Sequence, residues 1–491
     1  MLEDVTLKEA IKGLKPESLW NYFYELNQVP RESKNEKAAI EWTASVAKKL
    51  GLSYKIDKVG NIVISKPASK GKEKATPVVL QGHIDMVCEK NADVIHDFSK
   101  DPIQLVRDGE YIRAAGTTLG ADNGIGVATA LAVLSDKSLV HPPIEALFTI
   151  DEETGLTGAV SLEPGFVQGK ILLNCDSEED GVLYVGCAGG KDTEVTFDID
   201  WQKAPVGSQA IAVKLSGLRG GHSGLEIHQG HANALKQLNR IIWKAAEQFK
   251  FSLFYIDGGT KHNAIPRDAE YCLLIDGKSA DPFKQFIADC ETMLKGEFKQ
   301  IEPKLKLTAE AISDYPEKVF SPEFQSRLLN FLYAIPHGVK KMSHDIPGLV
   351  ETSTNAAIVR TKDDQVSLLT SQRSSVASEI VGIADKVKAT GLLAGGKVRQ
   401  STGYPAWAPN MQSKILGLMK SVHKDLFGKE PDVKAIHAGL ECGIIGEKYE
   451  GMDMISFGPT LKAVHSPDER VEVATVEKFW QLLLEVLKQI E

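Results

Sequence analysis

Short apolar runs alternate with amphipathic stretches along the first part of the chain. The run at 124–134, rich in Ala, Val and Leu, predicts a buried helix. Ser33 followed by Glu36 fits a capping box, which predicts a helix that runs to Leu50 and ends at Gly51. Strands are expected at 54–57, 61–65, 77–81, 144–150 and 170–175. This alternation predicts an α/β layered domain.

From about residue 189 the pattern changes, because alternating strands now lie between strongly amphipathic helices. The clearest strands are 210–215 and 271–275, and the clearest helices are 232–249 and 282–295. Similar sequence continues to about residue 397. This mixture predicts an inserted α+β domain, large enough for two small sheet-and-helix units.

The chain is expected to return to its first domain near Gln400. A helix at 408–427 and a core strand at 454–457 support this return. The expected domains are therefore 1–188 and 400–491, which together form the first domain, and 189–399, which forms the insertion. A length of 491 residues fits two or more domains.

Composition narrows the classes of partner. The net charge of -9, from 57 basic and 66 acidic residues, argues against a nucleic acid held mainly through its phosphates. No apolar run is long enough to span a membrane, and the N-terminus lacks a signal-peptide pattern. The six cysteines are scattered without a CxxC pair, which predicts neither a disulfide framework nor a thiolate zinc site. We expect a cytoplasmic protein with no membrane partner.

Polar clusters follow several of the predicted strands. His83 and Asp85 lie two residues apart after the strand at 77–81, so an extended backbone directs both side chains to one side. One of them could bind a metal ion while the other orients it. Taken alone, this cluster fits an ordinary strand-end turn better. Asp122, between two glycines at the start of the helix, fits either a metal ligand or an N-cap.

Three consecutive acids, Asp151, Glu152 and Glu153, follow the strand at 144–150. Crowded like charges need a cation or strong hydrogen bonds, unless they form a solvated turn. Asp176, after the strand at 170–175, and His465 are further candidates.

In an α/β sheet such strand ends converge on one edge. Two histidines and three carboxylates supply the nitrogen and oxygen ligands that two zinc ions need. One carboxylate is then left for acid–base chemistry.

Five motifs carry a family resemblance. They are GHID at 82–85, GADNG at 120–124, DEETG at 151–155, NCDSE at 174–178 and VHSP at 464–467. In this order and over nearly the whole chain, they resemble the M20 family of zinc metallopeptidases, and within it the aminoacyl-histidine (Xaa-His) dipeptidases. The resemblance implies a catalytic domain, with a mixed sheet flanked by helices, and an inserted α+β lid domain.

The resemblance also implies roles for the ligands. His83 and Asp176 would bind one zinc ion, Glu153 and His465 the other, and Asp122 would bridge both. Asp85 would hold the His83 imidazole, and Glu152 would be the general base. The Asp122–Asn123 peptide would be cis. Co²⁺ or Mn²⁺ can substitute for zinc in such a site.

The insertion resembles the lid of the family. His222, in GLRGGHSG at 217–224, would polarise the scissile carbonyl, and Asn263 would contact substrate. We expect Arg373 to bind the substrate α-carboxylate, because a guanidinium fork matches a carboxylate. Glu441 would meet the free amino group of the substrate. The alternatives are a structural loop histidine for His222, a surface arginine for Arg373 and a capped helix start for Glu441.

These inferences predict a dinuclear zinc dipeptidase that acts on a small peptide such as β-alanyl-histidine. Closure of the lid would bring His222 and Arg373 to the substrate. A related N-acyl amino acid deacylase or aminopeptidase with the same metal centre is the alternative among enzymes. A catalytically inactive binding protein on the same fold is the alternative from another class. A homodimer is possible, and His222 could then act across it.

Overall fold

The computed structural model describes residues 8–491, so the acidic N-terminal residues lie outside the described part. The chain divides into two compact units. The first comprises Met1–Gly186, Pro409–Ala435 and Leu440–Glu491, and the second comprises Cys187–Ala408 and Ile436–Gly439. The sequence placed the boundaries at 189 and 400.

Backbone hydrogen bonds account for the extent of the second unit. The Ala188 N–H donates to the carbonyls of Ile436 and Ala438, and Cys187 and Trp407 exchange two hydrogen bonds. These bonds hold the short segment Ile436–Gly439 in the second unit, although it is flanked by segments of the first.

The first unit is built on an eight-stranded mixed sheet with the order β1-β2-β6-β3-β7-β21-β8-β20. Its central strands β6, β3, β7 and β21 are parallel, whereas β2 runs antiparallel to β6. The strands are β1 (Ser53–Ile56), β2 (Ile62–Lys66), β3 (Val78–His83), β6 (Ile144–Thr149), β7 (Ile171–Asn174), β8 (Val182–Cys187), β20 (Asp432–Ile436) and β21 (Asp453–Ser456). The α/β prediction and its strands are confirmed.

Helices of the first unit follow the apolar pattern. The predicted buried helix is α4 (Ala121–Ser135), which packs against β3 and α2. The helices of this unit are η1 (Glu9–Ile11), α2 (Glu17–Leu26), α3 (Lys37–Leu50), α4, α5 (Glu152–Gly155), α6 (Thr157–Ser161), α11 (Lys414–Phe427), α12 (Glu441–Lys448) and α13 (Val473–Gln489). Gly51, with φ of 69°, ends α3 as predicted.

Two helix starts differ from the sequence prediction. The capping box is wrong, because α3 begins only at Lys37 and the Ser33 hydroxyl donates to Asp85 instead. The start of α11 is also later than expected. It begins after Ser413, whose hydroxyl accepts the Leu416 N–H, rather than at residue 408.

A small four-stranded sheet, β22-β23-β5-β4, also belongs to the first unit. Its strands are β4 (Leu105–Asp108), β5 (Tyr111–Ala114), β22 (Leu461–Lys462) and β23 (Arg470–Glu472). The loop 463–469, which carries His465, joins the antiparallel pair β22 and β23. His465 itself has a positive φ of 60°.

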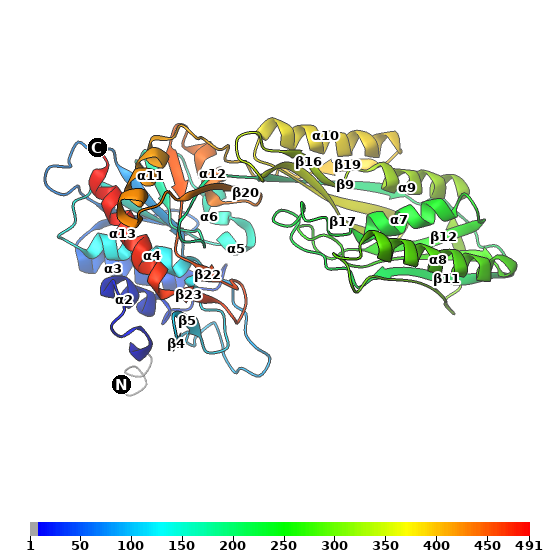
Figure 1. Ribbon diagram of the computed structural model, residues 1–491, viewed down its shortest axis with the longest axis horizontal. Coiled ribbons are helices and arrows are strands. Elements are labelled where there is room, and N and C mark those ends of the chain that lie inside the picture. Colours follow the sequence, from blue (N-terminus) through cyan, green and yellow to red (C-terminus); the bar gives the residue numbers. More distant parts are fainter. Residues whose placement is uncertain (1–7) are drawn as a thin grey trace. The chain divides into compact units, whose positions relative to one another are not determined.

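The second unit contains a nine-stranded sheet with the order β14-β11-β13-β12-β17-β18-β9-β19, in which β16 pairs with β17. Its helices α7, α8, α9 and α10 bury their apolar sides in one core against this sheet (Figure 1). The expected strands 210–215 and 271–275 are β11 and β13, and the expected helices 232–249 and 282–295 are α7 and α8.

The elements of the second unit are β9 (Gly189–Asp198), β10 (Trp201–Lys203), β11 (Ser208–Ser216), α7 (Ala234–Ala245), β12 (Phe251–Gly258), β13 (Ala269–Asp276), α8 (Gly277–Glu297), β14 (Lys306–Ala311), β15 (Lys318–Phe320), α9 (Pro322–Ala334), β16 (Gly338–Met342), β17 (Val350–Lys362), β18 (Gln365–Ser374), α10 (Ala377–Leu393) and β19 (Lys397–Gln400). A short pairing between β12 and β17 joins a group of four strands (β14, β11, β13 and β12) to a group of five (β17, β18, β9, β19 and β16) in the one sheet.

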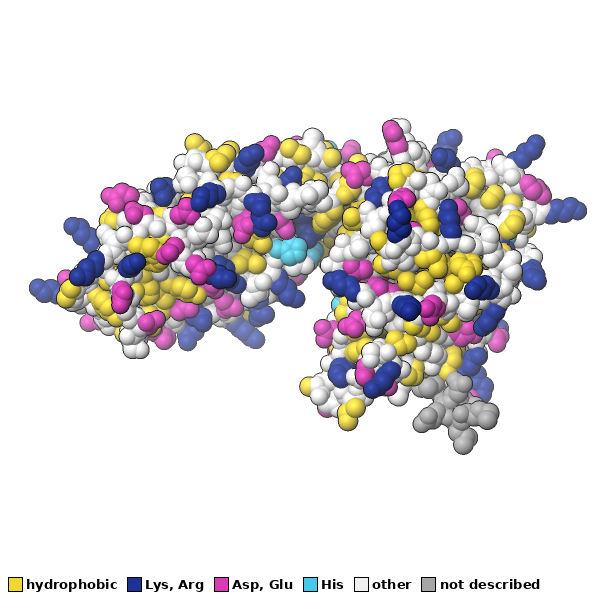
Figure 2. Space-filling view, turned by 180° about the vertical axis from the view of Figure 1, so that it is seen from behind, with side chains coloured by type: hydrophobic (Ala, Val, Ile, Leu, Met, Phe, Trp, Pro, Cys, Tyr) yellow, Lys and Arg dark blue, Asp and Glu magenta, His cyan; other side chains and the backbone are white. Residues whose placement is uncertain are grey.

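None of the helices within residues 8–491 has both the length and the apolar character that a membrane crossing requires. Lysine and arginine side chains are interspersed with aspartate and glutamate over the face that Figure 2 shows.

Candidate active site

The parallel strands of the first unit bring the predicted ligands to one edge of the sheet. His83 is the last residue of β3, Glu153 lies just after β6, and Asp176 follows β7. Because β3 lies between β6 and β7 and runs parallel to both, these three strand ends are neighbours. The remaining two expected ligands come from the start of α4 and from the loop 463–469.

Asp122 lies between the two histidines. Its Oδ1 is 3.1 Å from His83 Nε2, and its Oδ2 is 3.1 Å from His465 Nε2. Burial opposes ionisation of Asp122, but the two imidazoles lower the pKa of this carboxyl below its usual value. Each oxygen of one carboxylate therefore faces a different imidazole.

Each imidazole also has its own carboxylate. His83 Nε2 is 3.4 Å from Asp176 Oδ1, and His465 Nε2 is 2.9 Å from Glu153 Oε2. We call His83 with Asp176 the His83 set, and His465 with Glu153 the His465 set. Ligand atoms of His83, Asp122 and Glu153 all lie within 4.8 Å of one another.

The charge balance of this cluster indicates that it needs cations. The pKa of Asp176 is raised to about 8. Burial is the main cause, and the neighbouring carboxyls of Asp122 and Glu441 contribute to the same shift. Burial likewise raises the pKa of Glu178 to about 7. Carboxyls crowded in this way are neutralised by divalent cations, and imidazole with carboxylate is a donor set that suits zinc. The residues therefore fit bound divalent metal ions.

Asp85 supports the His83 imidazole. Its Oδ1 lies 3.4 Å from His83 Nδ1, and its carboxylate accepts the Glu152 N–H and the Ser33 hydroxyl. Burial opposes ionisation, but the hydrogen bonds from His83 and Ser33 hold the pKa of Asp85 below its usual value. An ionised Asp85 fixes the ring orientation, so that Nε2 faces the ligand cluster.

The three consecutive acids have different surroundings. Burial raises the pKa of Glu152 well above its usual range, and the carboxyls of Asp176 and Glu153 raise it further. Asp151 instead accepts hydrogen bonds from the hydroxyls of Thr154 and Thr157 and supports the turn. The structure therefore separates Asp151 from the two acids that the sequence proposed for chemistry.

The start of α4 does not use Asp122 as a cap. Gly120 occupies the N-cap position and no side chain caps it, so the N-cap interpretation of Asp122 is wrong. The Asp122–Asn123 peptide is cis, as the family resemblance implied. The Asn123 amide donates to the Cys175 carbonyl at 2.6 Å and so ties this start to the segment before Asp176.

Glu441 lies at the start of α12 in the first unit and is 1% exposed. Its Oε2 accepts hydrogen bonds from the Gln81 amide at 2.6 Å and the Thr149 hydroxyl at 2.7 Å. Its Oε1 has no hydrogen-bond partner. Burial raises the pKa of this carboxyl to about 7. Glu441 therefore offers one free oxygen to a hydrogen-bond donor.

His222 belongs to a separate polar cluster in the second unit. Its Nδ1 accepts the N–H groups of Leu225 at 3.0 Å and Gly224 at 3.3 Å. The pKa of His222 is lowered to about 4. Burial is the main cause, and the Arg373 charge contributes to the same shift. At neutral pH the ring is therefore uncharged and carries its proton on Nε2, where it can donate a hydrogen bond.

Arg373, on β18 in the same unit, is only 6% exposed, so its interpretation as a surface arginine is wrong. One of its terminal nitrogens donates to the Tyr404 hydroxyl at 2.9 Å, and its Nε has no hydrogen-bond partner. The Tyr404 ring fits against Gly190 and Gly439, where a Cβ would come within 2.5 and 2.8 Å of it. A buried, incompletely paired guanidinium favours an anion.

Asn263 lies beside the loop that carries His222. Its carbonyl accepts the Ser223 N–H at 2.8 Å, and the adjacent Ala264 forms a β-bridge with His222. A fourth residue, His437, was not predicted. Its Nε2 lies 2.7 Å from the Ser353 hydroxyl, and burial lowers its pKa to about 3, with Arg373 adding to the shift.

Two buried charges near Asp122 were also missed by the sequence analysis. Glu469 lies four residues beyond His465, and Arg31 precedes α3. Both are 2% exposed and bind backbone groups of the segment that ends at Asp122. Glu469 lies close to His465 in the sequence, but no local pattern predicts which backbone groups its carboxylate binds.

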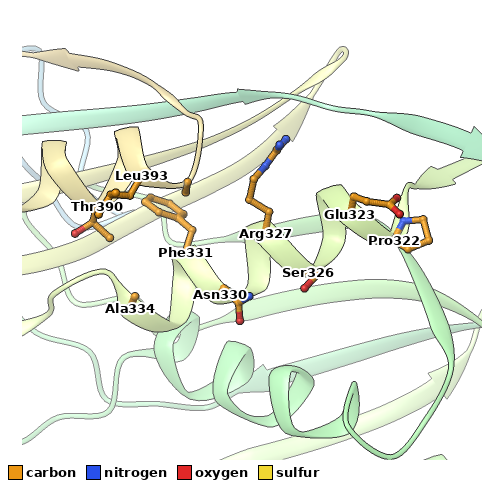
Figure 3. Close-up of a pocket in the computed structure, with 10 residues that line it drawn as sticks. Pro322, Glu323, Ser326, Arg327, Asn330, Phe331, Ala334, Thr390 and Leu393 are labelled. Atoms are coloured by element: carbon orange, nitrogen blue, oxygen red, sulfur yellow. The ribbon is translucent and has the colours of Figure 1, made fainter.

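A groove of about 780 Å³ lies between α9 and α10 in the second unit. Figure 3 shows Arg327, Phe331 and Leu393 among the side chains that line it. None of the predicted site residues contributes to this groove. It is therefore separate from both polar clusters.

Known proteins resemble the chain over nearly its whole length. It is 41% identical over 480 residues to the cytosol non-specific dipeptidase of Escherichia coli, an alignment that covers 98% of this chain and 99% of that protein. It is also 41% identical to the crystal structure of aminoacylhistidine dipeptidase from Vibrio alginolyticus. That comparison gives a TM-score of 0.89 and covers 98% of each chain.

A more distant structure shares only the fold. Aminopeptidase PepT from Bacillus cereus is 16% identical, with a TM-score of 0.56 over 97% of this chain and 98% of that one. The sequence profile of peptidase family M20/M25/M40 matches residues 79–489. The family inferred from the five motifs is therefore confirmed: the chain belongs to the M20 family of peptidases, which are metal-dependent hydrolases of peptide bonds.

Proposed function

We propose that this peptidase hydrolyses dipeptides, including Xaa-His dipeptides such as β-alanyl-histidine, with two zinc ions bound by the ligands of the first unit. The observation that carries the proposal is the position of Asp122, whose two oxygens face His83 and His465 separately. The names of the two relatives that are 41% identical support the dipeptide substrate. The Escherichia coli relative also supports a cytoplasmic location for this chain.

In the proposed site, His83 and Asp176 would hold one metal ion, His465 and Glu153 would hold the other, and Asp122 would serve both. When bound, the ions supply Lewis acidity that activates water and the peptide carbonyl. Glu152 is not needed as a ligand. Burial and neighbouring carboxyls raise its pKa, and cations bound beside it would oppose this shift and leave the carboxylate ionised. Glu152 therefore takes the proton from the attacking water and passes it to the leaving amine.

The polar cluster of the second unit supplies recognition. His222, with its proton on Nε2, donates to the carbonyl oxygen as negative charge develops there. Arg373 binds the α-carboxylate of the dipeptide through nitrogens that Tyr404 leaves free. This pairing restricts substrates to short peptides, because the carboxylate must lie close to the scissile bond.

Glu441 and Asn263 complete the proposed substrate contacts. The free Oε1 of Glu441 accepts a hydrogen bond from the unblocked amino group of the substrate. Asn263 contacts the substrate from the turn before Ala264, which forms a β-bridge with His222. Whether His222 acts in its own chain or across a homodimer is decided by mixing inactive Glu152→Gln and His222→Ala chains. The mixture recovers activity only if His222 acts across a dimer. If His222 acts within its own chain, no activity is recovered.

The experiment compares metals and substrates in one purified preparation. The chelated protein receives defined equivalents of Zn²⁺, Co²⁺ or Mn²⁺ and is assayed with β-alanyl-histidine, other dipeptides and N-acetyl amino acids. We expect no activity without metal, full activity with two equivalents of Zn²⁺, and preference for unblocked dipeptides. Faster release of acetate from N-acetyl amino acids would instead establish a deacylase. Inactivity on every substrate would establish a binding protein.

A further inference from the structure

The segment 119–122, which ends at Asp122, is held from its N–H side by a single buried carboxylate. Glu469 Oε2 accepts the N–H groups of Leu119 at 2.7 Å and Gly120 at 2.9 Å. Glu469 Oε1 accepts those of Ala121 at 2.8 Å and Asp122 at 3.2 Å. Each carboxylate oxygen thus accepts two hydrogen bonds. Together these four bonds hold the backbone of the segment that ends at Asp122, the proposed bridging ligand.

Glu469 also belongs to the loop that carries His465. The Glu469 N–H donates to the Ser466 carbonyl, and the Ser466 hydroxyl donates to the Ala463 carbonyl, so this loop is braced internally. His465 lies within it and faces Asp122 and Glu153. One carboxylate therefore joins the loop that carries His465 to the segment that carries Asp122.

Arg31 holds the same segment from its carbonyl side. It donates to the Gly120 carbonyl at 2.6 Å, and its other terminal nitrogen donates to the Asp85 carbonyl at 3.1 Å. A Cβ at Gly120 would lie 2.3 Å from the guanidinium, and Gly120 has a φ of +67°. Arg31 therefore ties the Asp122 segment to the residues directly after His83, whereas Glu469 ties it to the His465 loop.

We propose that Glu469 is a positioning residue for the His465 set, and that it controls the affinity of the metal ion bound there while the His83 set is affected less. The asymmetry follows from the scaffold. His83 lies at the end of β3 and Asp176 just beyond the end of β7, and these two strands pair with each other through their backbones. His465 lies on the loop 463–469 rather than on a strand, and Glu469 joins this loop to the backbone N–H groups of the Asp122 segment. This inference rests on the proposed dinuclear centre.

The test uses Glu469→Gln, which keeps the shape of the side chain but replaces one acceptor oxygen by an N–H donor. Zn²⁺ content is measured after dialysis against buffered free metal, and Co²⁺ titrations are followed by visible absorption. We expect the affinity for one ion to fall by about 10–100-fold and that for the other to change by less than about threefold. His465→Ala identifies the weakened position, because its single-metal Co²⁺ spectrum should match that of Glu469→Gln.

Glu302→Gln is the matched control. Glu302 is also 2% exposed and accepts two backbone N–H groups, those of Arg219 and Ala232, but it lies in the second unit. The Glu302→Gln variant should have a lower Tm but an unchanged affinity for each of the two metal ions. Arg31→Lys is the counterpart. We expect it to lower the affinity for the ion of the His83 set at least as much as the affinity for the ion of the His465 set.

The outcomes separate this inference from the proposed function. A wild-type protein that binds fewer than two ions contradicts the dinuclear centre. A wild-type protein with two ions, combined with equal or no loss in Glu469→Gln, contradicts the positioning role. If Glu469→Gln does not fold, Glu469→Asp keeps the charge on a shorter side chain, and the same selective loss is expected. Equal loss of both ions in Glu469→Asp also overturns the proposal.

Discussion

Each of the two units carries a polar cluster, and the two clusters favour ligands of opposite charge. In the first unit, burial and crowding raise the pKa of Asp176 to about 8 and of Glu178 to about 7. In the second unit, burial and the Arg373 charge lower the pKa of His222 to about 4 and of His437 to about 3. The first cluster therefore favours cations and the second an anion, which are the requirements of metal ions and a substrate carboxylate.

The scaffolds of the two clusters differ as well. His83, Glu153 and Asp176 follow adjacent parallel strands, so backbone pairing sets their spacing. His222 lies on a loop held by hydrogen bonds from its own backbone, while Arg373 lies on the antiparallel strand β18. We therefore expect the first cluster to hold the metal ions and the base, and the second to contact the carbonyl oxygen and the α-carboxylate of the substrate. The predictions below test this division.

The largest effect is expected at Glu152. Glu152→Gln removes the general base but no proposed ligand, so kcat should fall by about 10²–10⁴-fold while bound zinc is retained. Steady-state kinetics with β-alanyl-histidine and metal analysis of the same preparation measure both quantities. Asp151→Asn is the neighbouring control. It replaces one of the two oxygens that accept the Thr154 and Thr157 hydroxyls by an NH2 donor, and it should lower Tm more than kcat. Near-normal turnover in Glu152→Gln would remove Glu152 from the role of base.

The next effect tests whether the second cluster also contributes to the chemical step. His222→Ala removes the Nε2–H donor and should lower kcat by about 10²–10³-fold, because the lost hydrogen bond strengthens as charge develops on the oxygen. Zinc content should stay unchanged. The exposed His228 in the same segment is the control, and His228→Ala should retain kcat. A fall in zinc content in His222→Ala would contradict the separation of the two clusters.

The sequence predicted the scaffold of the first unit better than its interactions. Uniform apolar runs at β3, β6, β7 and α4 were sufficient, because such runs are buried on both faces of a parallel sheet or all around a helix. The rule that parallel strand ends converge then predicted which polar residues would gather. Their individual roles remain predictions that the experiments above address.

The capping-box error and the unpredicted partners of Glu469 share one physical cause. Ser33 and Glu36 match a local capping pattern, but the Ser33 hydroxyl donates to Asp85, and the Glu36 carboxylate accepts the distant Asp151 N–H as well as that of nearby Lys34. Glu469 likewise binds a segment about 350 residues away. A buried polar group takes whichever partner the fold brings near, and local pattern carries no information about that partner.

A smaller effect is expected at Arg373, and it concerns recognition rather than chemistry. Arg373→Ala removes the proposed charge-assisted contact with the α-carboxylate, which is worth roughly 1.5–3 kcal/mol. For a free dipeptide kcat/KM should fall by about ten- to a hundredfold. For the C-terminal amide of the same dipeptide the change should be small, because it has no carboxylate to lose. Equal losses on both substrates would show that Arg373 acts through folding or lid closure.

The smallest effect is expected at Tyr404, whose hydroxyl is a hydrogen-bond partner of Arg373. Tyr404→Phe keeps the ring that fits against Gly190 and Gly439 and removes only the acceptor of the guanidinium proton. Loss of one such bond costs about 0.5–1.5 kcal/mol, so KM for a free dipeptide should rise by about two- to tenfold with kcat nearly unchanged.

The amide substrate and the double variant sharpen this last prediction. If Tyr404 acts by orienting Arg373, Tyr404→Phe should leave kinetics on the amide unchanged and should add nothing to Arg373→Ala. A Tyr404→Phe loss that persists on the amide, or that adds fully to the loss in Arg373→Ala, would instead assign the hydroxyl a role independent of the guanidinium. Either result would show that the anion site of the second unit has more than one recognition group, whereas the predicted result makes the guanidinium its centre.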